Sequence, residues 1–407
     1  MTRDVLALVQ AGGSGGRMDV LTRERAKPAL PFGGVHRMID FTLTALVHAG
    51  VRDVWVSLEY QVASIDQHLS GGRPWDLDSS RGGFRRMVPQ TGSGPPTEDA
   101  FAHGNGDLLL RLARDIEAHG AETLVVSSAD HVFATDLAPV IAGHRESGLA
   151  ATLLTAEVTR REAAQNVVVT SGRGGIVRQV EEKPSRPSTG TVATEIFVYS
   201  TEPLLATLRE LRKELSADAE GDDSGIGDFG EHLLPRLVEQ RQVRAVPIDG
   251  YWRDLGRPGA YLQGHRDLLR GRVQIHHPDR PIISKWPDRP AARVRAGARL
   301  EDSMMATGCD VAGTVLGSVL GPGVVVEAGA HVEDSVLLDD VVVRRGARVT
   351  TAVVDERSEI GPDAVVGGPT RTRVARDEEV TLVGRESRVG RRQEVALGAR
   401  LEPGTTV

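Results

Sequence analysis

The 407-residue sequence predicts an α/β protein in which a mostly parallel sheet with helices is followed by a triangular β-helix. Three observations predict this fold. A short apolar run opens the chain and stops at a glycine-rich stretch, strand and helix patterns then alternate, and aliphatic residues near the C-terminus recur every six positions. The length allows two or three domains with substantial cores.

The opening strand pattern covers Asp4 to Gln10, and the glycine and serine positions from Gly12 to Gly16 follow it directly. A glycine-rich turn after a buried strand aims several backbone N–H groups at one anion, so this stretch predicts a phosphate-binding loop. Arg17 and Lys27 add two cations close by. A tight turn without a ligand is the alternative, and neither GxxxxGK[ST] nor GxGxxG fits, since the latter needs glycine in place of Met18.

The next elements alternate as strand and helix, which predicts parallel pairing. Strands are expected at 54–58, 123–127 and 151–155, and helices at 39–49, 107–118 and 203–215. The segment from Leu69 to Asn105 is rich in Gly, Pro, Ser and Arg and is expected to be a long mobile loop, which in a compact domain is usually functional. The acidic stretch 218–223 looks disordered.

The expected domain boundaries are 1–270 for the catalytic domain, 271–290 for a linker rich in proline and histidine, and 291–407 for the β-helix. Within the last part, Leu320, Val326, Val332 and Leu338 are spaced by six. The series then continues at Val343, Val349, Val354, Ile360 and Val366. A period of six predicts triangular coils of about eighteen residues with the aliphatic residues inside, whereas strands of a sandwich predict a period of two.

The net charge of −7 argues against a nucleic-acid-binding protein, which normally carries a basic surface. One cysteine, Cys309, permits no disulfide within the chain and fits a reducing compartment. The first apolar run is too short for a signal peptide, and no apolar segment is long enough to span a membrane. We therefore expect a soluble cytoplasmic protein.

Two aspartates are candidate ligands for a divalent cation. Asp130 follows an apolar strand, where open α/β sheets build their sites, and Asp254 lies in the aromatic stretch that begins at Tyr251. Two carboxylates that converge suit Mg²⁺, although each alone is more often a cap or turn residue. Glu182 and Lys183 stand at the end of another strand, where Pro184 stops the ladder.

Taken together, these motifs resemble those of the sugar-1-phosphate nucleotidyltransferases, within them the ADP-glucose pyrophosphorylase-like branch. The resemblance spans nearly the whole chain and rests on these motifs: Ala11 to Arg17, Leu21 to Gly34, Arg37 to Phe41, Asp130-His131, Glu182-Lys183-Pro184, Asp228-Phe229-Gly230, Tyr251 to Gly256 and the hexapeptide repeats. It implies a Rossmann-like nucleotidyltransferase domain followed by a left-handed β-helix that mediates homo-oligomers, dimers or tetramers.

The resemblance also implies the reaction and its residues. The phosphate of a sugar 1-phosphate attacks the α-phosphorus of a nucleoside triphosphate and releases pyrophosphate, so catalysis consists of positioning and charge neutralisation. The implied catalytic residues are Arg17, Lys27, Asp130, Lys183 and Asp254, with Asp130 and Asp254 holding Mg²⁺. The implied nucleotide-binding residues are Ala11, Gly12, Gly13, Ser14, Gly15, Gly16, Gln90, Gly104 and Asn105, and the implied substrate-binding residues are Glu182, Lys183 and Glu195.

Several positions depart from the glycogen-type enzymes of this family. The stretch Ala102 to Asp107 replaces Tyr-Arg-Gly-Thr-Ala-Asp, and Ala193 to Phe197 replaces Ser-Met-Gly-Ile-Tyr, which removes a hydroxyl and adds the carboxylate of Glu195. Such changes in a pocket that reads hydroxyl groups alter which ring fits. Glu24 stands where those enzymes have an activator-site lysine, so an anionic activator is expected to be repelled.

These departures favour a cyclitol 1-phosphate over glucose 1-phosphate. Among divergent relatives, the chain resembles the valienol-1-phosphate guanylyltransferases of antibiotic biosynthesis, a resemblance that implies a purine nucleotide, GTP or ATP. Glucose-1-phosphate adenylyltransferase and a non-catalytic pyrophosphorylase-like regulatory subunit are the alternatives, although the regulatory reading conflicts with the presence of both aspartates. A hexapeptide acyltransferase would need a catalytic histidine, and His331 is the only histidine after residue 277.

Overall fold

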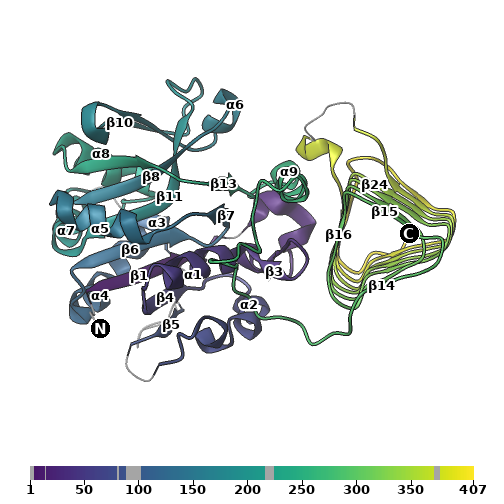
Figure 1. Ribbon diagram of the computed structural model, residues 1–407. Coiled ribbons are helices and arrows are strands. Elements are labelled where there is room, and N and C mark those ends of the chain that lie inside the picture. Colours follow the sequence, from purple (N-terminus) through teal and green to yellow (C-terminus); the bar gives the residue numbers. More distant parts are fainter. Residues whose placement is uncertain (1–3, 14, 80–81, 89–101, 216–223, 371–375) are drawn as a thin grey trace, which may run out of the picture.

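The computed structural model describes residues 4–13, 15–79, 82–88, 102–215, 224–370 and 376–407. Figure 1 shows an α/β domain and a triangular prism of parallel strands side by side, joined by an extended segment. The last helix of the α/β domain is α9 (Pro258–Leu269), and the first strand of the prism is β14 (Arg293–Val294).

The central sheet of the α/β domain contains nine strands in the order β10-β9-β11-β6-β1-β4-β5, with β8 and β12 continuing from β11. The strands are β1 (Val5–Gln10), β4 (Asp53–Ser57), β5 (Phe84–Met87), β6 (Thr123–Ser128), β8 (Ala151–Glu157), β9 (Val167–Ser171), β10 (Val177–Glu182), β11 (Thr191–Ser200) and β12 (Val243–Pro247). The centre, from β6 through β1 and β4 to β5, is parallel, and β11 joins it antiparallel. The α/β fold class and the β-helix that follows it are confirmed.

Helices cover both faces of this sheet (Figure 1). They are α1 (Met38–His48), α2 (Val62–Leu69), α3 (Asn105–Arg111), α4 (Ala113–His119), α5 (Ala138–Ser147), α6 (Arg160–Ala163), α7 (Thr201–Leu215), α8 (Leu234–Glu239) and α9. Alternate residues of β1 point to opposite faces, so Leu6 and Leu8 pack on the side of α4 and α7, whereas Ala7 and Val9 pack on the side of α1.

Shorter elements complete the α/β domain. They are η1 (Gly16–Thr22), η2 (Lys27–Ala29), β2 (Pro31–Phe32), β3 (His36–Arg37), η3 (Ser70–Trp75), β7 (His131–Ala134), η4 (Arg173–Gly175), the π-helix η5 (Phe229–Leu233) and β13 (Tyr251–Asp254). The expected helix over 107–118 is divided at Leu112 into α3 and α4.

The expectation of one long loop from Leu69 to Asn105 is wrong for the residues that the structure describes there. Residues 70–75 form η3, and β5 pairs with β4 at the edge of the sheet. Glycines permit this compact path, because a Cβ on Gly72 would lie 2.6 Å from the Cβ of Phe84. Residues 89–101, and the acidic stretch 218–223, lie outside the described residues.

The C-terminal part forms three six-stranded parallel sheets, one on each face of the prism, as in a left-handed β-helix. The first sheet contains β14, β17 (Asp310–Val311), β20 (Val325–Val326), β23 (Val342–Val343), β26 (Glu359–Ile360) and β29 (Arg388–Val389). The second contains β15 (Arg299–Glu301), β18 (Thr314–Leu316), β21 (His331–Glu333), β24 (Arg348–Thr350), β27 (Val365–Gly367) and β30 (Glu394–Val395). The third contains β16 (Met304–Met305), β19 (Val319–Leu320), β22 (Val336–Leu337), β25 (Ala352–Val354), β28 (Thr381–Val383) and β31 (Arg400–Leu401), and η6 (Asp377–Glu379) precedes β28.

The register corrects two details of the predicted repeat. Leu320 pairs with Leu337, and Leu337 pairs with Val354, so each of these coils takes 17 residues instead of about eighteen. The residue inside the prism is therefore Leu337. Leu338, which the six-residue spacing places inside, packs outward in the cluster shared with the α/β domain.

That shared cluster joins the two parts of the chain. Its members from the α/β domain include Met18, Leu21, Leu30, Phe32, Tyr261 and Leu262, and those from the β-helix are Val336, Leu338, Val353, Val380 and Leu382. All of these side chains are at most 2 % exposed. The two parts are therefore joined by an apolar core of their own.

Candidate active site

A pocket of about 380 Å³ opens at the carboxyl ends of β1 and β6, the edge at which parallel sheets place their sites. Eleven of the predicted residues line this pocket: Ala11, Gly12, Gly13, Arg17, Lys27, Gly104, Asn105, Asp130, Lys183, Glu195 and Asp254. Gly15, Gly16 and Glu182 lie next to it without lining it, and Ser14 and Gln90 lie outside the described residues.

The glycine loop runs from the end of β1 into η1. The structural reason for a glycine differs from one position of the loop to the next. Gly15 has a φ of 67°, and a Cβ there would lie 3.1 Å from the Cβ of Lys27. A Cβ on Gly12 would lie 2.7 Å from the side chain of Glu59, whereas Gly13 has open space around it. Thr22 closes the turn by donating its hydroxyl to the Gly15 carbonyl at 2.9 Å. Neighbouring side chains therefore leave no room for a Cβ at Gly12 and little at Gly15, whereas a Cβ at Gly13 would meet no other atom.

A small antiparallel sheet brings the two predicted aspartates together. Asp130 lies between β6 and β7, and β13 pairs with β7 so that Asp254 stands opposite His131. The amide of Gly256 donates to Asp254 Oδ1 at 2.7 Å, and the Ser128 hydroxyl donates to Asp130 Oδ1. Residues more than a hundred positions apart therefore form one carboxylate pair.

Lys27 lies between these carboxylates. Its Nζ forms an ion pair with Asp130 and lies 3.6 Å from Asp254 Oδ1, and its side chain is only 5 % exposed. Burial alone would raise the pKa of each aspartate, but the charge of Lys27, followed by that of His131, lowers both below their ordinary values. Both carboxylates are therefore ionised at neutral pH.

The carboxylate pair fits a hard divalent cation. Asp130 and Asp254 are two carboxylates that approach the same buried ammonium group of Lys27, so their oxygens lie in one part of the pocket. Carboxylate oxygens are the ligands that Mg²⁺ prefers. The residues that would hold it are Asp130 and Asp254, and Glu195 offers a further oxygen within 4.8 Å of Asp130 and His131 ligand atoms.

His131 is a site residue whose role the motif alone did not predict. Its Nδ1 contacts the Thr194 carbonyl at 3.1 Å, so its Nε2 faces Asp130 at 3.5 Å and Asp254 at 3.7 Å. Trp252 packs edge-on against the ring at 5.3 Å between centroids. The ring is thus fixed in one orientation toward the carboxylates.

Glu195 has an unusual backbone for its residue type. It lies at an irregularity of β11, between the pairs of Ala193 and Phe197 with β8, and its φ is 56°. Burial raises the pKa of its carboxyl group, and the charges of Asp130 and Asp254 raise it further. Left-handed backbone in a non-glycine residue is strained, and such residues concentrate at functional sites.

Glu182 and Lys183 come from the end of β10. Lys183 Nζ lies 2.6 Å from Glu182 Oε1 and 3.5 Å from Asp228 Oδ2, with 53 % of its side chain exposed. Glu182 fits against Gly230, where a Cβ would clash with its Oε2. The Asp228-Phe229-Gly230 motif therefore packs against the end of β10 and supports Glu182 and Lys183. The sequence pattern alone did not predict this role of the motif.

Gly104 and Asn105 lie at the start of α3. Gly104 has a φ of 115°, and a Cβ there would lie 2.5 Å from the backbone of Gly227, so only glycine fits. The Asn105 carbonyl accepts a hydrogen bond from Gln10 Nε2 at 3.0 Å, while its buried Oδ1 has no hydrogen-bond partner among the described residues. Asn105 thus lies at the wall of the pocket with its side-chain oxygen buried.

Several lining residues were not predicted as site residues. They are Gln10, Pro28, Glu59, Tyr60, Ala102, Leu108, Ser128, Gln165, Asn166 and Asp228. Most lie in loops or at element ends without a motif. Asn166 is the clearest case, because its carbonyl accepts from the Lys183 amide at 3.2 Å and so fixes that residue from a neighbouring loop.

His331, the histidine considered for an acyltransferase, lies on the outside of β21. It is 34 % exposed and contacts Glu333 at 3.2 Å. In the described part of the chain, none of the helices combines the length and the apolar content that crossing a membrane requires.

Comparison with known proteins gives two family matches and a set of relatives. Residues 6–271 match the Nucleotidyl transferase family, and residues 290–383 match the GlmU-like C-terminal hexapeptide family. The chain is 34 % identical to a glucose-1-phosphate adenylyltransferase of Thermomicrobium roseum, covering 99 % of this chain and 96 % of the relative. It is 30 % identical to the enzyme of that name from Bacillus cereus strain Q1, covering 93 % and 97 %, and 28 % identical to that of Acetivibrio thermocellus, covering 90 % and 84 %.

Proposed function

The chain belongs to the nucleotidyl transferase family and is a sugar-phosphate nucleotidyltransferase, and from this premise we propose that it joins ATP to glucose 1-phosphate or a close analogue. In this reaction a phosphate oxygen of the sugar 1-phosphate attacks the α-phosphorus of the nucleotide. The bond from that phosphorus to the β-phosphate oxygen breaks, and pyrophosphate leaves. An ionised phosphate needs no general base, so the protein must position two anions and neutralise their charge.

The observation that carries this proposal is the meeting of Asp130, Asp254 and Lys27 beside the glycine loop. Gly12 and Gly13 of the loop line the same pocket as Arg17, which supports a triphosphate site there, because a glycine-rich turn after a strand can aim backbone amides at an anion. In our proposal the loop residues Ala11 to Gly16 and Arg17 bind the phosphates, and Gly104 and Asn105 contact the base or ribose.

The proposed cofactor is Mg²⁺, which when bound supplies charge neutralisation at the phosphates of the nucleotide. Asp130 and Asp254 would hold it. Lys27 adds a second positive charge on the same side, and His131 keeps the two carboxylates oriented. Burial of these groups strengthens each of these interactions relative to water.

The proposed sugar-phosphate side of the pocket is the end of β10. Lys183 would bind the phosphate of the sugar, and its partial exposure leaves it accessible to an incoming anion. Glu182, which forms an ion pair with Lys183 beside the pocket, would accept hydrogen bonds from ring hydroxyls. These roles follow the family resemblance and remain proposals.

The relatives favour glucose 1-phosphate and ATP over the cyclitol phosphate that the sequence departures suggested and the GTP that the resemblance to guanylyltransferases implied. All three relatives named above bear the name glucose-1-phosphate adenylyltransferase. A cyclitol 1-phosphate such as valienol 1-phosphate, with GTP, stays as a second candidate because of Glu195. Glu195 lines the pocket where the glycogen-type motif has glycine, whereas Ala193 is buried in the core of the sheet and does not line the pocket.

A substrate matrix tests this choice. We expect pyrophosphate release with ATP and glucose 1-phosphate in the presence of Mg²⁺, at a kcat/KM at least about tenfold above that with GTP and valienol 1-phosphate, a difference of about 1.4 kcal/mol. UTP and dTTP serve as controls for the base. A preference of similar size for the cyclitol phosphate would instead support the second candidate, and no turnover with any pair would refute the proposed function.

We also propose that the enzyme is not activated by phosphorylated sugars. Glu24 Oε2 lies 3.6 Å from Arg385 Nε. Arg385, a cation next to Glu24, is therefore already paired with a carboxylate of the chain. A bisphosphorylated sugar at millimolar concentration should change kcat less than about twofold, because Glu24 repels it. A Glu24→Lys variant provides the matched comparison, and strong activation of the wild type would contradict the proposal.

A further inference from the structure

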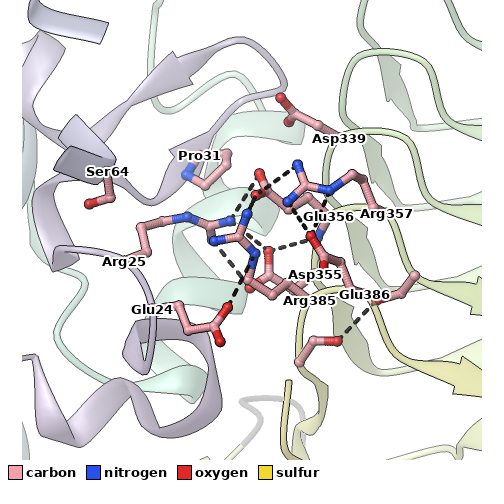
Figure 2. Close-up of polar contacts among 12 residues, drawn as sticks. Glu24, Arg25, Pro31, Ser64, Asp339, Asp355, Glu356, Arg357, Arg385 and Glu386 are labelled. Carbon is pink, nitrogen blue, oxygen red and sulfur yellow. Dashed lines mark hydrogen bonds and ion pairs between the residues drawn. The ribbon is translucent and has the colours of Figure 1, made fainter. Parts of the chain in front are cut away.

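A buried ion-pair cluster lies where the β-helix meets the segment between η1 and η2 (Figure 2). Arg25 is at its centre. Its Nη2 and Nη1 donate to the two oxygens of Asp355 at 2.9 Å and 3.3 Å, and its Nη2 lies 3.0 Å from Glu356 Oε2. The Arg25 side chain is 6 % exposed and that of Asp355 is 2 % exposed. The pair is bidentate and almost fully removed from water.

The rest of the cluster surrounds this pair with alternating charges. Glu356 also forms ion pairs with Arg385 and Arg357, and Arg357 lies 2.6 Å from the exposed carboxylate of Glu386. Burial opposes ionisation of Glu356, but the charge of Arg25, followed by that of Arg385, keeps its pKa below the ordinary value. The carboxylates of the β-helix are thus arranged around one arginine of the α/β domain.

Arg25 lies two residues before Lys27, the cation of the active site. Between them, the amide of Ala26 donates to the Ser64 hydroxyl at 2.9 Å. The short segment is therefore held on one side by the β-helix and on the other by α2, and Lys27 extends from it to Asp130 and Asp254. A displacement of Arg25 would pass to Lys27 through only two peptide units.

The domains do not depend on this pair to stay together. The apolar cluster shared by the two parts remains without it, and further ion pairs cross the same boundary: Arg23 with Glu402, Arg400 with Asp19, Arg257 with Asp377 and Arg266 with Asp334. The contact between the two parts is therefore extensive without the Arg25–Asp355 pair, and the effect of this pair is expected on the segment around Arg25 itself.

We propose that Asp355 of the β-helix is a positioning residue for nucleotidyl transfer, acting through Arg25 on Lys27. The β-helix then contributes directly to the geometry of the catalytic site. This inference rests on the proposed function only for its kinetic readout, because the position of the segment around Arg25 is measurable without turnover.

The test uses the full-length protein with Asp355→Asn, Arg25→Gln, the double variant carrying both changes, and Glu386→Gln as the matched control at the exposed rim of the same cluster. We expect each single variant to lower kcat about tenfold, with the KM for the sugar phosphate changed less than about twofold. Glu386→Gln should keep both values. Hydrogen exchange of the backbone over residues 23–30 should be faster in Asp355→Asn and unchanged in Glu386→Gln.

The double variant separates positioning from stability. Each single change leaves a buried charge without its bidentate partner, whereas the double change removes both charges, so its Tm should recover toward the wild-type value. The kcat of the double variant should stay low, because the bidentate ion pair between positions 25 and 355 is absent and no longer positions the segment that carries Lys27. A kcat that recovers together with Tm, or wild-type kcat in Asp355→Asn, would overturn the inference.

Failure of the proposed function gives a different pattern. If wild-type protein released no pyrophosphate with any substrate pair, hydrogen exchange over residues 23–30 would decide alone. Faster exchange in Asp355→Asn than in Glu386→Gln would support the positioning role, and equal exchange would refute it.

Discussion

Replacing Asp130 or Asp254 by asparagine is expected to lower turnover at least about a hundredfold, which corresponds to about 2.7 kcal/mol of transition-state stabilisation. Each change removes one of the two charges proposed to hold Mg²⁺. Asparagine keeps the size of the side chain, and an oxygen that still accepts hydrogen bonds from Ser128 or Gly256. The measurement is steady-state pyrophosphate release at saturating substrates.

The stability of these variants should change little. Lys27 contacts both carboxylates, so the loss of one charge leaves it paired with the other, and the mutual repulsion of the two aspartates disappears. We expect the free energy of unfolding to fall by no more than about 1–2 kcal/mol. Asp249→Asn, an exposed carboxylate five residues before Asp254, is the matched control. Near-wild-type turnover in both site variants would contradict the metal assignment.

Ending the chain after Pro290 is expected to abolish soluble, active protein. The truncation uncovers the apolar side chains that the α/β domain contributes to the shared cluster, such as Phe32 and Tyr261, and removes Asp355, the ion-pair partner of Arg25. Exposed apolar surface of this kind drives association. Size-exclusion chromatography with light scattering should show aggregates for residues 1–290, whereas the full chain should form a dimer or tetramer.

The full chain is the control in this experiment, and its own state is part of the prediction. Among the described residues, β14, β15 and β16 in the first coil and β30 and β31 in the last coil are edge strands of their sheets, whereas residues 405–407 pair with β29. Association between copies of the chain can cover such edges. A monodisperse, active fragment of residues 1–290 would show that the α/β domain is independent of the β-helix. A monomeric full-length protein would contradict the expected assembly.

Local sequence was sufficient to predict β1, β4, β6 and β8 and the glycine loop that follows β1. β1 is a continuous apolar run, because a central strand is buried on both faces, and its end at Gln10 is marked by glycines. β6 likewise has a buried apolar interior in the centre of the sheet, and Asp130 follows its end. The glycine loop after β1 and Asp130 after β6, which both line the pocket, could therefore be identified from neighbouring residues alone.

Contacts between distant residues were not predictable in the same way. The pairing of β7 with β13, which brings Asp254 opposite His131, depends on strands of only four residues each. The position of Leu338 depended on the step between coils, because a six-residue spacing and a five-residue step differ by one residue and turn the side chain outward. The pair of Arg25 with Asp355 has no local pattern.

The ion pairs between the start and the end of the chain also have a consequence for biosynthesis. Asp19 and Arg23, just after the glycine loop, contact Arg400 and Glu402, and the members of the first pair are 381 positions apart in the sequence. At a translation rate of about 5–20 residues per second, the ribosome needs about 20–80 s to make the second partner after the first. The segment around the glycine loop of the nascent chain therefore stays without these contacts until the final coil emerges, and a product terminated early in the last coils cannot complete them.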